Sequence, residues 1–406
     1  MSGTTPSVSP TVPSMSTTAP SVSVAAPPLT LYVHMPWCVR KCPYCDFNSH
    51  QLKSAAPPRE YIDALIEDFA LDAPLFGSRT IEAVFFGGGT PSLFAPAEIA
   101  RLLAALRERA RFAADAEITL EANPGTIERG RFEGYRSAGV NRVSLGAQSF
   151  APGALERLGR IHGPLDTYRA VEELRAAGLE NFNLDLMYAL PGQTVEEALE
   201  DVRIACDLEP AHLSHYQLTL EPGTVFHARP PRLPDDDVAF SMQTECQALL
   251  AERGYEQYEI SAYGRPAARC RHNLNYWLFG DYVGIGAGAH GKITLAAPDR
   301  IVRTEKPRQP REFLARTQAL ARSPESTRRA VPRAELPFEF MLNALRLNDG
   351  FDLRMYESRT GLGRDSIEPT LEKARERGLA ETTARGWRAS ELGRRFLNDL
   401  QATFLA

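Results

Sequence analysis

Three cysteines stand close together in the segment LYVHMPWCVRKCPYCDFNSH, residues 31–50. Cys38, Cys42 and Cys45 follow the spacing C-x3-C-x2-C, with Tyr44 directly before the last of them. The segment begins with an apolar run, so we expect the cysteines on a loop that leaves a first strand. A loop can curl so that three thiolates converge on one inorganic centre, and thiolates are soft ligands that suit iron–sulfur clusters, zinc or copper(I).

The number of local cysteines leaves more than one kind of site open. A [4Fe–4S] cluster normally takes four cysteines, so three would leave one iron free for a ligand from outside the protein. A zinc loop could instead be completed by His34 or His50, and three unrelated thiols are the simplest alternative. The spacing alone does not choose between them.

A glycine-rich turn, FFGGGTPS at residues 85–92, lies further along the chain. Glycines directly after a strand let backbone amides approach a ligand closely, because no side chain stands in the way. Taken by itself, the run Gly87–Gly89 predicts only a tight turn.

From residue 31 the sequence alternates between strand-like and helix-like patterns, which indicates βαβ units and a parallel sheet. We expect strands at residues 31–35, 81–86, 117–121, 141–145, 183–187 and 215–220. We expect helices at residues 59–71, 96–111, 127–138, 167–177, 194–208 and 235–253. About six such units predict an α/β fold, an open three-quarter TIM barrel that is two units short of closure. Polar residues gather where these strands end, the edge that carries the chemistry in this architecture.

The remaining segments differ in composition from the barrel. Residues 1–28 are mostly Ser, Thr, Pro, Val and Ala, and we expect a disordered tail. Residues 29–255 would form the barrel. Residues 256–330, rich in aromatic residues and glycine, would form a linking region, in which we interpret GIGAGAHG as a tight strand–turn element. Residues 331–406 predict a C-terminal domain of helices and a hairpin that resembles a winged helix.

Composition limits the partners and the compartment. A formal net charge of −5 argues against a protein that coats nucleic acid or membranes. The arginines of the C-terminal segment alternate with glutamates, as on a solvated helix face. No run approaches the roughly 18–20 apolar residues that span a bilayer, so any membrane contact would be transient. Six cysteines, half of them in one loop, fit a reducing compartment, and we expect a cytoplasmic location.

The cysteine loop, followed by GGTP at the opening of an α/β barrel, resembles the radical S-adenosylmethionine (SAM) superfamily. Further motifs make it similar to the HemN/HemW branch: EANPG from Glu121, SLGAQSF from Ser144, GRIH from Gly159 and NLDLMYALPGQ from Asn183. This branch contains oxygen-independent coproporphyrinogen III dehydrogenases and their heme-chaperone relatives. The resemblance runs to the C-terminus, so the last domain is expected to be of the HemN type.

The resemblance implies two cofactors. The three cysteines would hold a [4Fe–4S] cluster, and the methionine amino and carboxylate groups of SAM would complete its fourth iron. The reduced cluster can pass an electron to the sulfonium, so the cofactor carries the hard chemistry and the protein positions it. The residues that the resemblance assigns to SAM are Tyr32, Tyr44, Gly88, Gly89, Thr90, Glu121, Gln148, Arg160 and Asp185. Glu121 and Asp185 could instead cap turns, and Arg160 could form a surface ion pair.

Two features indicate the chaperone side of the branch. The dehydrogenases carry a further cysteine two places after the triad, where this chain has Phe47. The chaperone-type members share HNxxYW, which residues 272–277 match as HNLNYW. The heme-binding residues that this resemblance implies are His272, Asn273, Tyr276 and Trp277. A histidine can ligate heme iron, and aromatic rings offer flat faces to a porphyrin. The alternative is a hydrogen-bonded histidine at a domain junction; Cys270 is a further candidate iron ligand outside the motif.

The sequence therefore predicts a heme chaperone that hands heme to apo-hemoproteins such as respiratory enzymes, with an electron donor required only if SAM is cleaved. The main alternative is an enzyme, an oxygen-independent coproporphyrinogen III dehydrogenase in which Phe47 is a tolerated departure. A zinc-binding regulator with a winged-helix tail is the more distant alternative. No nucleic-acid partner is expected.

Overall fold

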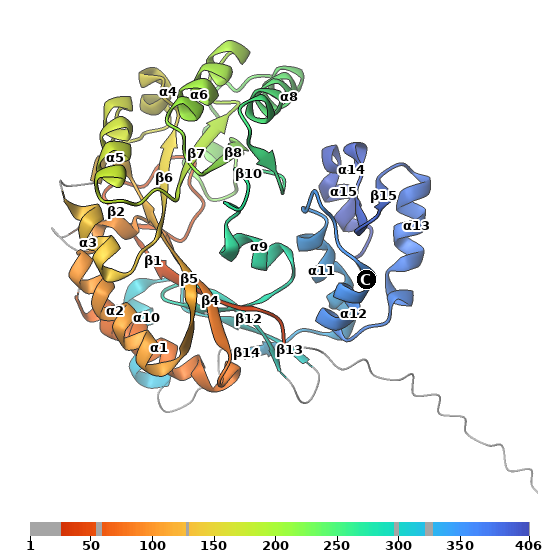
Figure 1. The fold of residues 1–406 in the computed structure, drawn as a ribbon, viewed down its shortest axis with the longest axis horizontal. Coiled ribbons are helices and arrows are strands. Elements are labelled where there is room, and N and C mark those ends of the chain that lie inside the picture. The colour runs from red at the N-terminus through yellow and green to blue at the C-terminus, as the bar shows by residue number, and fades with distance from the viewer. Residues whose placement is uncertain (1–25, 54–58, 127–129, 296–299, 321–327, 406) are drawn as a thin grey trace, which may run out of the picture.

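A twelve-stranded sheet forms the frame of the molecule (Figure 1). The computed structural model describes residues 26–53, 59–126, 130–295, 300–320 and 328–405. The strand order is β14-β13-β12-β11-β1-β4-β5-β6-β7-β8-β10-β9. The strands on the barrel side are β1 Leu29–Met35, β4 Thr80–Gly88, β5 Arg111–Ala122, β6 Arg142–Gln148, β7 Phe182–Tyr188 and β8 His212–Gln217. The later strands are β9 Glu256–Gln257, β10 Ala262–Gly264, β11 Asp281–Ile285, β12 His290–Leu295, β13 Arg300–Glu305 and β14 Arg328–Ala330.

The central strands run parallel, as the sequence predicts. From β11 through β1 and β4 to β8, each neighbouring pair is parallel. Six of these strands overlap the six expected ones, with β8 beginning and ending three residues earlier than expected. β11 is a seventh strand, which enters beside β1 from a distant part of the chain. Within the described ranges the edge strands β14 and β9 do not pair with each other. The prediction of an open, partial barrel is confirmed.

Helices cover the outer face of this sheet (Figure 1). They are α1 Arg59–Phe76, α2 Pro96–Arg109, α3 Arg131–Ala138, α4 Pro152–Arg157, α5 Pro164–Ala176, α6 Val195–Asp207, α8 Asp236–Glu252 and α10 Pro310–Leu320. Apolar side chains of strands and helices, such as Leu31, Val84 and Leu65, form one continuous buried core. The start of the expected helix at residues 127–138 and most of the expected tail fall outside the described residues, at 127–129 and 1–25. In the described part of the chain, no helix combines the length and apolar character needed to cross a bilayer.

The aromatic segment contains a helix that the sequence did not predict, α9 Arg271–Trp277, between the barrel and the C-terminal elements (Figure 1). The expected order of helices and a hairpin follows it. These elements are α11 Leu336–Ala344, α12 Leu353–Thr360, α13 Glu368–Glu376, β15 Ala380–Thr383, β16 Gly386–Ala389, α14 Glu391–Arg395 and α15 Leu397–Ala402. They share a second core around Phe340, Tyr356 and Trp387, which Phe279 joins from the loop after α9.

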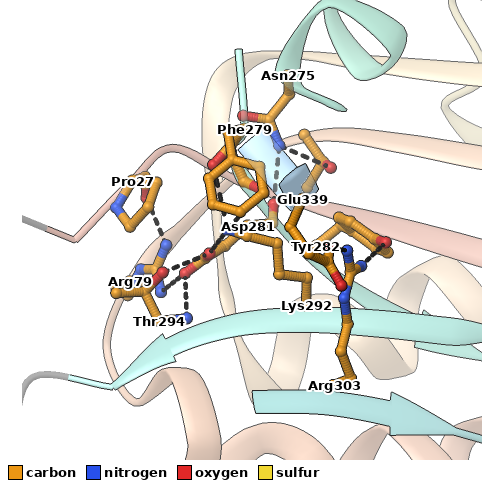
Figure 2. A network of polar contacts seen from close by, with 12 residues as sticks. Pro27, Arg79, Asn275, Phe279, Asp281, Tyr282, Lys292, Thr294, Arg303 and Glu339 are labelled. Carbon is orange, nitrogen blue, oxygen red and sulfur yellow. Dashed lines mark hydrogen bonds and ion pairs between the residues drawn. The ribbon is translucent and has the colours of Figure 1, made fainter. Parts of the chain in front are cut away.

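A buried polar network fastens β11 to its surroundings (Figure 2). Asp281, the first residue of β11, accepts hydrogen bonds from Arg79 at 2.8 Å and from Lys292 at 2.9 Å. Lys292 also donates to two backbone carbonyls and lies 4.2 Å from the centre of the Phe279 ring. Since Arg79 precedes β4 and Lys292 lies on β12, this network ties together segments about 200 residues apart in the chain.

Candidate functional site

The three cysteines lie on one loop at the carboxyl end of β1. Cys38 ends the short strand β2 Trp37–Cys38, and the loop returns through β3 His50–Gln51, which pairs with β2. All three thiols line one cavity of about 340 Å³, which we call the cysteine cavity. None of the six cysteines is in a disulfide. Burial raises the pKa of the Cys38 and Cys45 thiols, and a bound cation such as a metal centre would favour their thiolate forms.

The glycine-rich turn forms a second wall of the cysteine cavity. Gly88 has φ +107°, and a Cβ on it would lie 2.3 Å from the ring of His34. A Cβ on Gly89 would lie 2.6 Å from the carbonyl oxygen of Trp37, so glycine is required at both positions. The N–H groups of this turn have partners within the protein. Those of Gly88, Gly89 and Thr90 donate to Glu121 at 3.1 Å, to the Met35 carbonyl at 2.7 Å and to the Trp37 carbonyl at 2.8 Å. Contacts from this turn to a bound ammonium group would therefore come from its carbonyl oxygens.

Two carboxylates face each other across the same cavity. Glu121 is the penultimate residue of β5, and Asp185 lies on β7. Burial, with the nearby Asp185 charge, raises the pKa of Glu121 to about 8. Burial also raises the pKa of Asp185, although Asn183 at 2.8 Å and Ser144 at 3.2 Å donate hydrogen bonds to it. A cation in this cavity would therefore be bound together with the release of a proton.

Gln148 and Arg160 complete the wall opposite the glycine turn. Gln148 ends β6 with φ +69°, an uncommon conformation for a residue with a side chain, and its amide oxygen accepts a hydrogen bond from Tyr216 at 2.8 Å. Arg160 donates to the Gly146 carbonyl at 2.6 Å and approaches the Cys42 sulfur at 3.7 Å. Its Nε is buried without a hydrogen-bond partner. Such an unpaired donor beside a cavity can donate a hydrogen bond to an anionic group of a ligand.

The residues fit a [4Fe–4S] cluster with a bound SAM. Three thiols, two carboxylates, a buried guanidinium and a glycine cradle surround one cavity. No group of three or more His, Cys, Asp or Glu side chains in the described ranges is arranged to hold a single metal ion. The cavity brings together all three cysteines and every residue expected for SAM except Tyr32. Tyr32 lies behind Glu121, with its ring 6.4 Å from that of Phe85.

Comparison with known proteins decides the family. Residues 32–205 match the Radical SAM superfamily model, and residues 331–396 match the HemN C-terminal domain. The chain is 50% identical to the heme chaperone HemW of Escherichia coli (strain K12), over 93% of this chain and 98% of that protein. It is 46% identical to the heme chaperone HemW of Haemophilus influenzae, with the same coverage of the two chains. The chain belongs to the HemW family.

The fold is that of the radical SAM enzyme coproporphyrinogen III oxidase, HemN, from Escherichia coli. The two structures agree with a TM-score of 0.77 over 93% of this chain and 90% of HemN, at 24% sequence identity. At that identity the likeness shows the fold alone. Membership of the radical SAM superfamily implies a [4Fe–4S] cluster and SAM as cofactors.

The HNLNYW motif of this HemW-family chain lies on α9, and its side chains point in different directions. His272 is 2% exposed, and its ring centre lies 5.1 Å from Phe85 and 4.9 Å from Tyr276. Trp277 instead packs under Arg346, at 4.3 Å, on the side of the C-terminal elements. Asn273, half-buried, belongs to the first turn of the same helix. The structure does not bring the four expected heme residues together on one open surface.

Sequence reasoning missed the residues that support the SAM site. Tyr216 on β8 holds Gln148, while Ser144 and Asn183 hold Asp185. Asn183 stands two residues before Asp185, so the alternation of a strand places both on one face. That period-two signal in NLDLMY could have identified Asn183 from the sequence.

Cys270, the further candidate iron ligand, is fully buried behind the sheet. Its sulfur lies 3.7 Å from the Glu117 carboxylate, and burial raises its pKa to about 12. A protonated thiol enclosed by protein is a poor ligand for heme. Its position does not support a role in metal binding.

Proposed function

We propose that this protein is a heme chaperone: it binds heme and transfers it to acceptor hemoproteins, and it carries a [4Fe–4S] cluster with an exchangeable SAM. The observation that carries the proposal is 50% identity to a protein named heme chaperone HemW over 98% of that relative. Apo-hemoproteins, respiratory enzymes among them, are the proposed acceptors. An electron donor is needed only if SAM is cleaved.

Cys38, Cys42 and Cys45 are the proposed cluster ligands. Their position on one loop at the wall of the cysteine cavity supports this role. Arg160, at 3.7 Å from the Cys42 sulfur, would offset negative charge on the thiolates. Burial raises the pKa of the Cys38 and Cys45 thiols, so cluster binding would release protons from them.

The polar walls of the cysteine cavity suit the separate parts of SAM. Glu121 and the carbonyl oxygens of the glycine turn would accept from the ammonium group. Arg160 and Gln148 would face the carboxylate, because a guanidinium donates to two oxygens at once. Asp185, on β7 and aligned by Ser144 and Asn183, suits the two hydroxyls of a ribose.

A coproporphyrinogen III dehydrogenase is the competing proposal, and the shared HemN fold is the observation in its favour. Phe47 argues against the dehydrogenase proposal, because the dehydrogenases whose cysteine loop this one resembles have a cysteine at the position of Phe47. Phe47 is 57% exposed at the rim of the cysteine cavity and brings no redox-active group there. We therefore propose heme transfer as the activity.

Two assays on the anaerobically reconstituted protein test the proposal. Titration with hemin, followed in the Soret region, should saturate at a fixed stoichiometry. Incubation with coproporphyrinogen III, SAM and dithionite should yield no decarboxylated product beyond the level of a triple Cys38→Ser, Cys42→Ser, Cys45→Ser control. Product at catalytic rates would establish the dehydrogenase instead, and a failure to bind hemin would exclude the chaperone.

A further inference from the structure

A second cavity lies next to the cysteine cavity. It has a volume of about 310 Å³, and its lining includes Tyr276, Tyr282 and His290; we call it the aromatic cavity. Tyr276 and Tyr282 lie with ring centres 4.1 Å apart. Phe47 lines both the aromatic cavity and the cysteine cavity, so its ring is shared by the two. This space offers flat apolar faces and the imidazoles of His34 and His290, whereas His272 is not among its lining residues. Both ring nitrogens of His34 already have hydrogen-bond partners, the Tyr32 hydroxyl and the Asn48 carbonyl.

The aromatic cavity continues into a larger cleft at the edge of the sheet. Tyr282 and His290 line both spaces. The cleft has a volume of about 900 Å³, within the range of small-molecule sites, and we call it the basic cleft. Its charged lining residues are Arg303, Lys306, Arg308, Arg316, Arg328 and Arg329, against Glu305 and Glu312. The cleft therefore carries a surplus of positive charge next to the aromatic cavity.

Most of these cations already have partners. Arg303 contacts the Tyr282 hydroxyl and Glu339 on α11 (Figure 2). Lys306 is held at 2.6 Å by Asp68, and Arg329 pairs with Glu335 at 3.3 Å. The remaining cationic residues include Arg308 and Arg316, neither of which has an ion pair with any described residue. They are the side chains best able to bind carboxylates of a ligand.

The position of His290 suits a metal ligand. It is the first residue of β12, its side chain is exposed, and it lies where the two spaces join. His272, in contrast, is enclosed by the rings of Tyr32, Phe85 and Tyr276. Heme iron could reach His272 only if α9 moved, whereas it could reach His290 from the surface.

We propose that heme binds across the aromatic cavity and the basic cleft, with His290 as the axial ligand of the iron, Phe47 and Tyr282 against the macrocycle, and Arg308 and Arg316 at the propionates. This inference rests on the proposed chaperone function and assigns the iron ligand and the propionate contacts to residues outside HNLNYW, of which Tyr276 lines the aromatic cavity. The chemistry of the two spaces matches the three parts of heme: an apolar ring, an iron that takes imidazole, and two carboxylates.

The heme site would be coupled to the cluster loop through Asn48. The Asn48 side chain donates to the carbonyls of Ala287 and Arg308, both at 2.8 Å. Its own carbonyl is 2.9 Å from His34 Nε2. Because Asn48 follows Phe47, ordering of this loop by a cluster would fix both the ring against heme and the segment that carries Arg308.

The ligand role of His290 is tested by hemin titration of the full chain with matched variants. His290→Gly should weaken hemin binding by at least about tenfold and change the Soret spectrum, and added imidazole should restore the spectrum. Binding of iron-free protoporphyrin IX should be unchanged, because it needs no axial ligand. His272→Phe, which removes the other imidazole but keeps a ring in the core, should bind hemin as the wild type does.

The roles of Arg308 and Arg316 are tested with a heme derivative that lacks the propionate charges. Arg308→Ala with Arg316→Ala should weaken hemin binding severalfold but leave hemin dimethyl ester binding unchanged, while Arg311→Ala, an exposed neighbour on α10, should alter neither. Unchanged SAM binding by each variant reports that it has folded. If wild-type protein binds no hemin, the chaperone function fails. If it does bind hemin but His290→Gly binds equally well with the same spectrum, the proposed site is overturned while the function stands.

Discussion

Glu121 is the residue whose protonation should control SAM binding. Its pKa of about 8 in the free protein means that it is mostly protonated at pH 7, and an incoming ammonium group favours its carboxylate. SAM affinity should therefore rise as the pH increases from 6.5 toward 8, with proton release on binding. Asp185 and Tyr32 are the neighbouring titratable groups, and both stay in place in the variant that tests this.

That variant is Glu121→Gln, which keeps the size of the side chain and cannot ionise. It should bind SAM roughly tenfold more weakly at pH 8, since a charge-assisted hydrogen bond is lost. Calorimetry in two buffers of different ionisation enthalpy counts the protons released. Equal proton release by the variant and the wild type would remove Glu121 from the ammonium site.

The cysteine triad should account for all of the iron. Reconstituted protein should contain about four iron and four sulfide per chain, and the Cys38→Ser, Cys42→Ser, Cys45→Ser variant close to none. Cys206→Ala is the matched control, because Cys206 is buried in α6, away from the cysteine cavity. One zinc ion and no sulfide per wild-type chain would instead support the alternative of a zinc-binding regulator.

Single residues were predicted best where a motif fixes several of them at once. The cysteines, the glycine turn, Glu121, Gln148, Arg160 and Asp185 all line the cysteine cavity. Residues that position other residues, such as Tyr216, which donates a hydrogen bond to Gln148, are not part of a short sequence motif. Their roles are visible only in the folded structure. The sequence singled out Phe47 because the related dehydrogenases have a cysteine at its position. That Phe47 lines two cavities follows only from the fold.

At the scale of elements, α9 is a helix that the sequence did not predict. HNLNYW contains the four heme residues that the resemblance implies, and a helix distributes consecutive side chains around its axis. His272 and Tyr276, four residues apart, share the face toward the barrel, while Trp277 turns toward Arg346. The motif therefore serves, at least in part, to join the two cores.

The buried position of His272 predicts a contribution to acid sensitivity. Burial lowers the pKa of His272 to about 3, so between that value and its ordinary pKa the unfolded chain binds more protons than the folded one. The folded state is thus fully favoured above pH 6.5 and loses stability as the pH falls. His272→Phe should remove this loss, and relative to the wild type it should gain about 1.4 kcal/mol for each pH unit below 6.

Urea denaturation of both proteins at a series of pH values measures this difference. Packing changes caused by the larger ring shift the free energy of unfolding by the same amount at every pH. The change of that free energy with pH therefore reports the titration of the imidazole. Parallel curves for the two proteins would show that His272 already titrates normally in the folded state.

At the scale of the whole molecule, long-range contacts decide how the C-terminal part joins the barrel. Arg79 meets Asp281, and Arg303 on β13 meets Glu339 on α11 (Figure 2). The βα rhythm predicted the partial barrel because neighbouring units are local in sequence. No local pattern predicts that β11 enters beside β1, because the pairing is made between residues 29–33 and 281–285.

The Lys292–Asp281 pair should therefore be costly to break. Lys292→Met leaves the Asp281 carboxylate buried, and we expect a loss of about 3–5 kcal/mol in the free energy of unfolding. The double variant Lys292→Met, Asp281→Asn should lose less than the sum of the single changes, because each removes the partner of the other. Burial alone would raise the pKa of Asp281, but the charges of Lys292 and Arg79 lower it below its ordinary value. The pair thus stabilises the fold above the ordinary Asp pKa, and acid should remove that contribution. Strictly additive losses in denaturant melts would contradict this coupling.

The chaperone function is tested most directly by heme transfer. Reconstituted protein loaded with one hemin is mixed anaerobically with an apo-hemoprotein, and the Soret spectra of donor and acceptor are followed over time. We expect that heme leaves this protein and restores the acceptor spectrum, and that the Cys38→Ser, Cys42→Ser, Cys45→Ser variant transfers heme more slowly. Heme that stays on the loaded protein while the acceptor remains empty would contradict it.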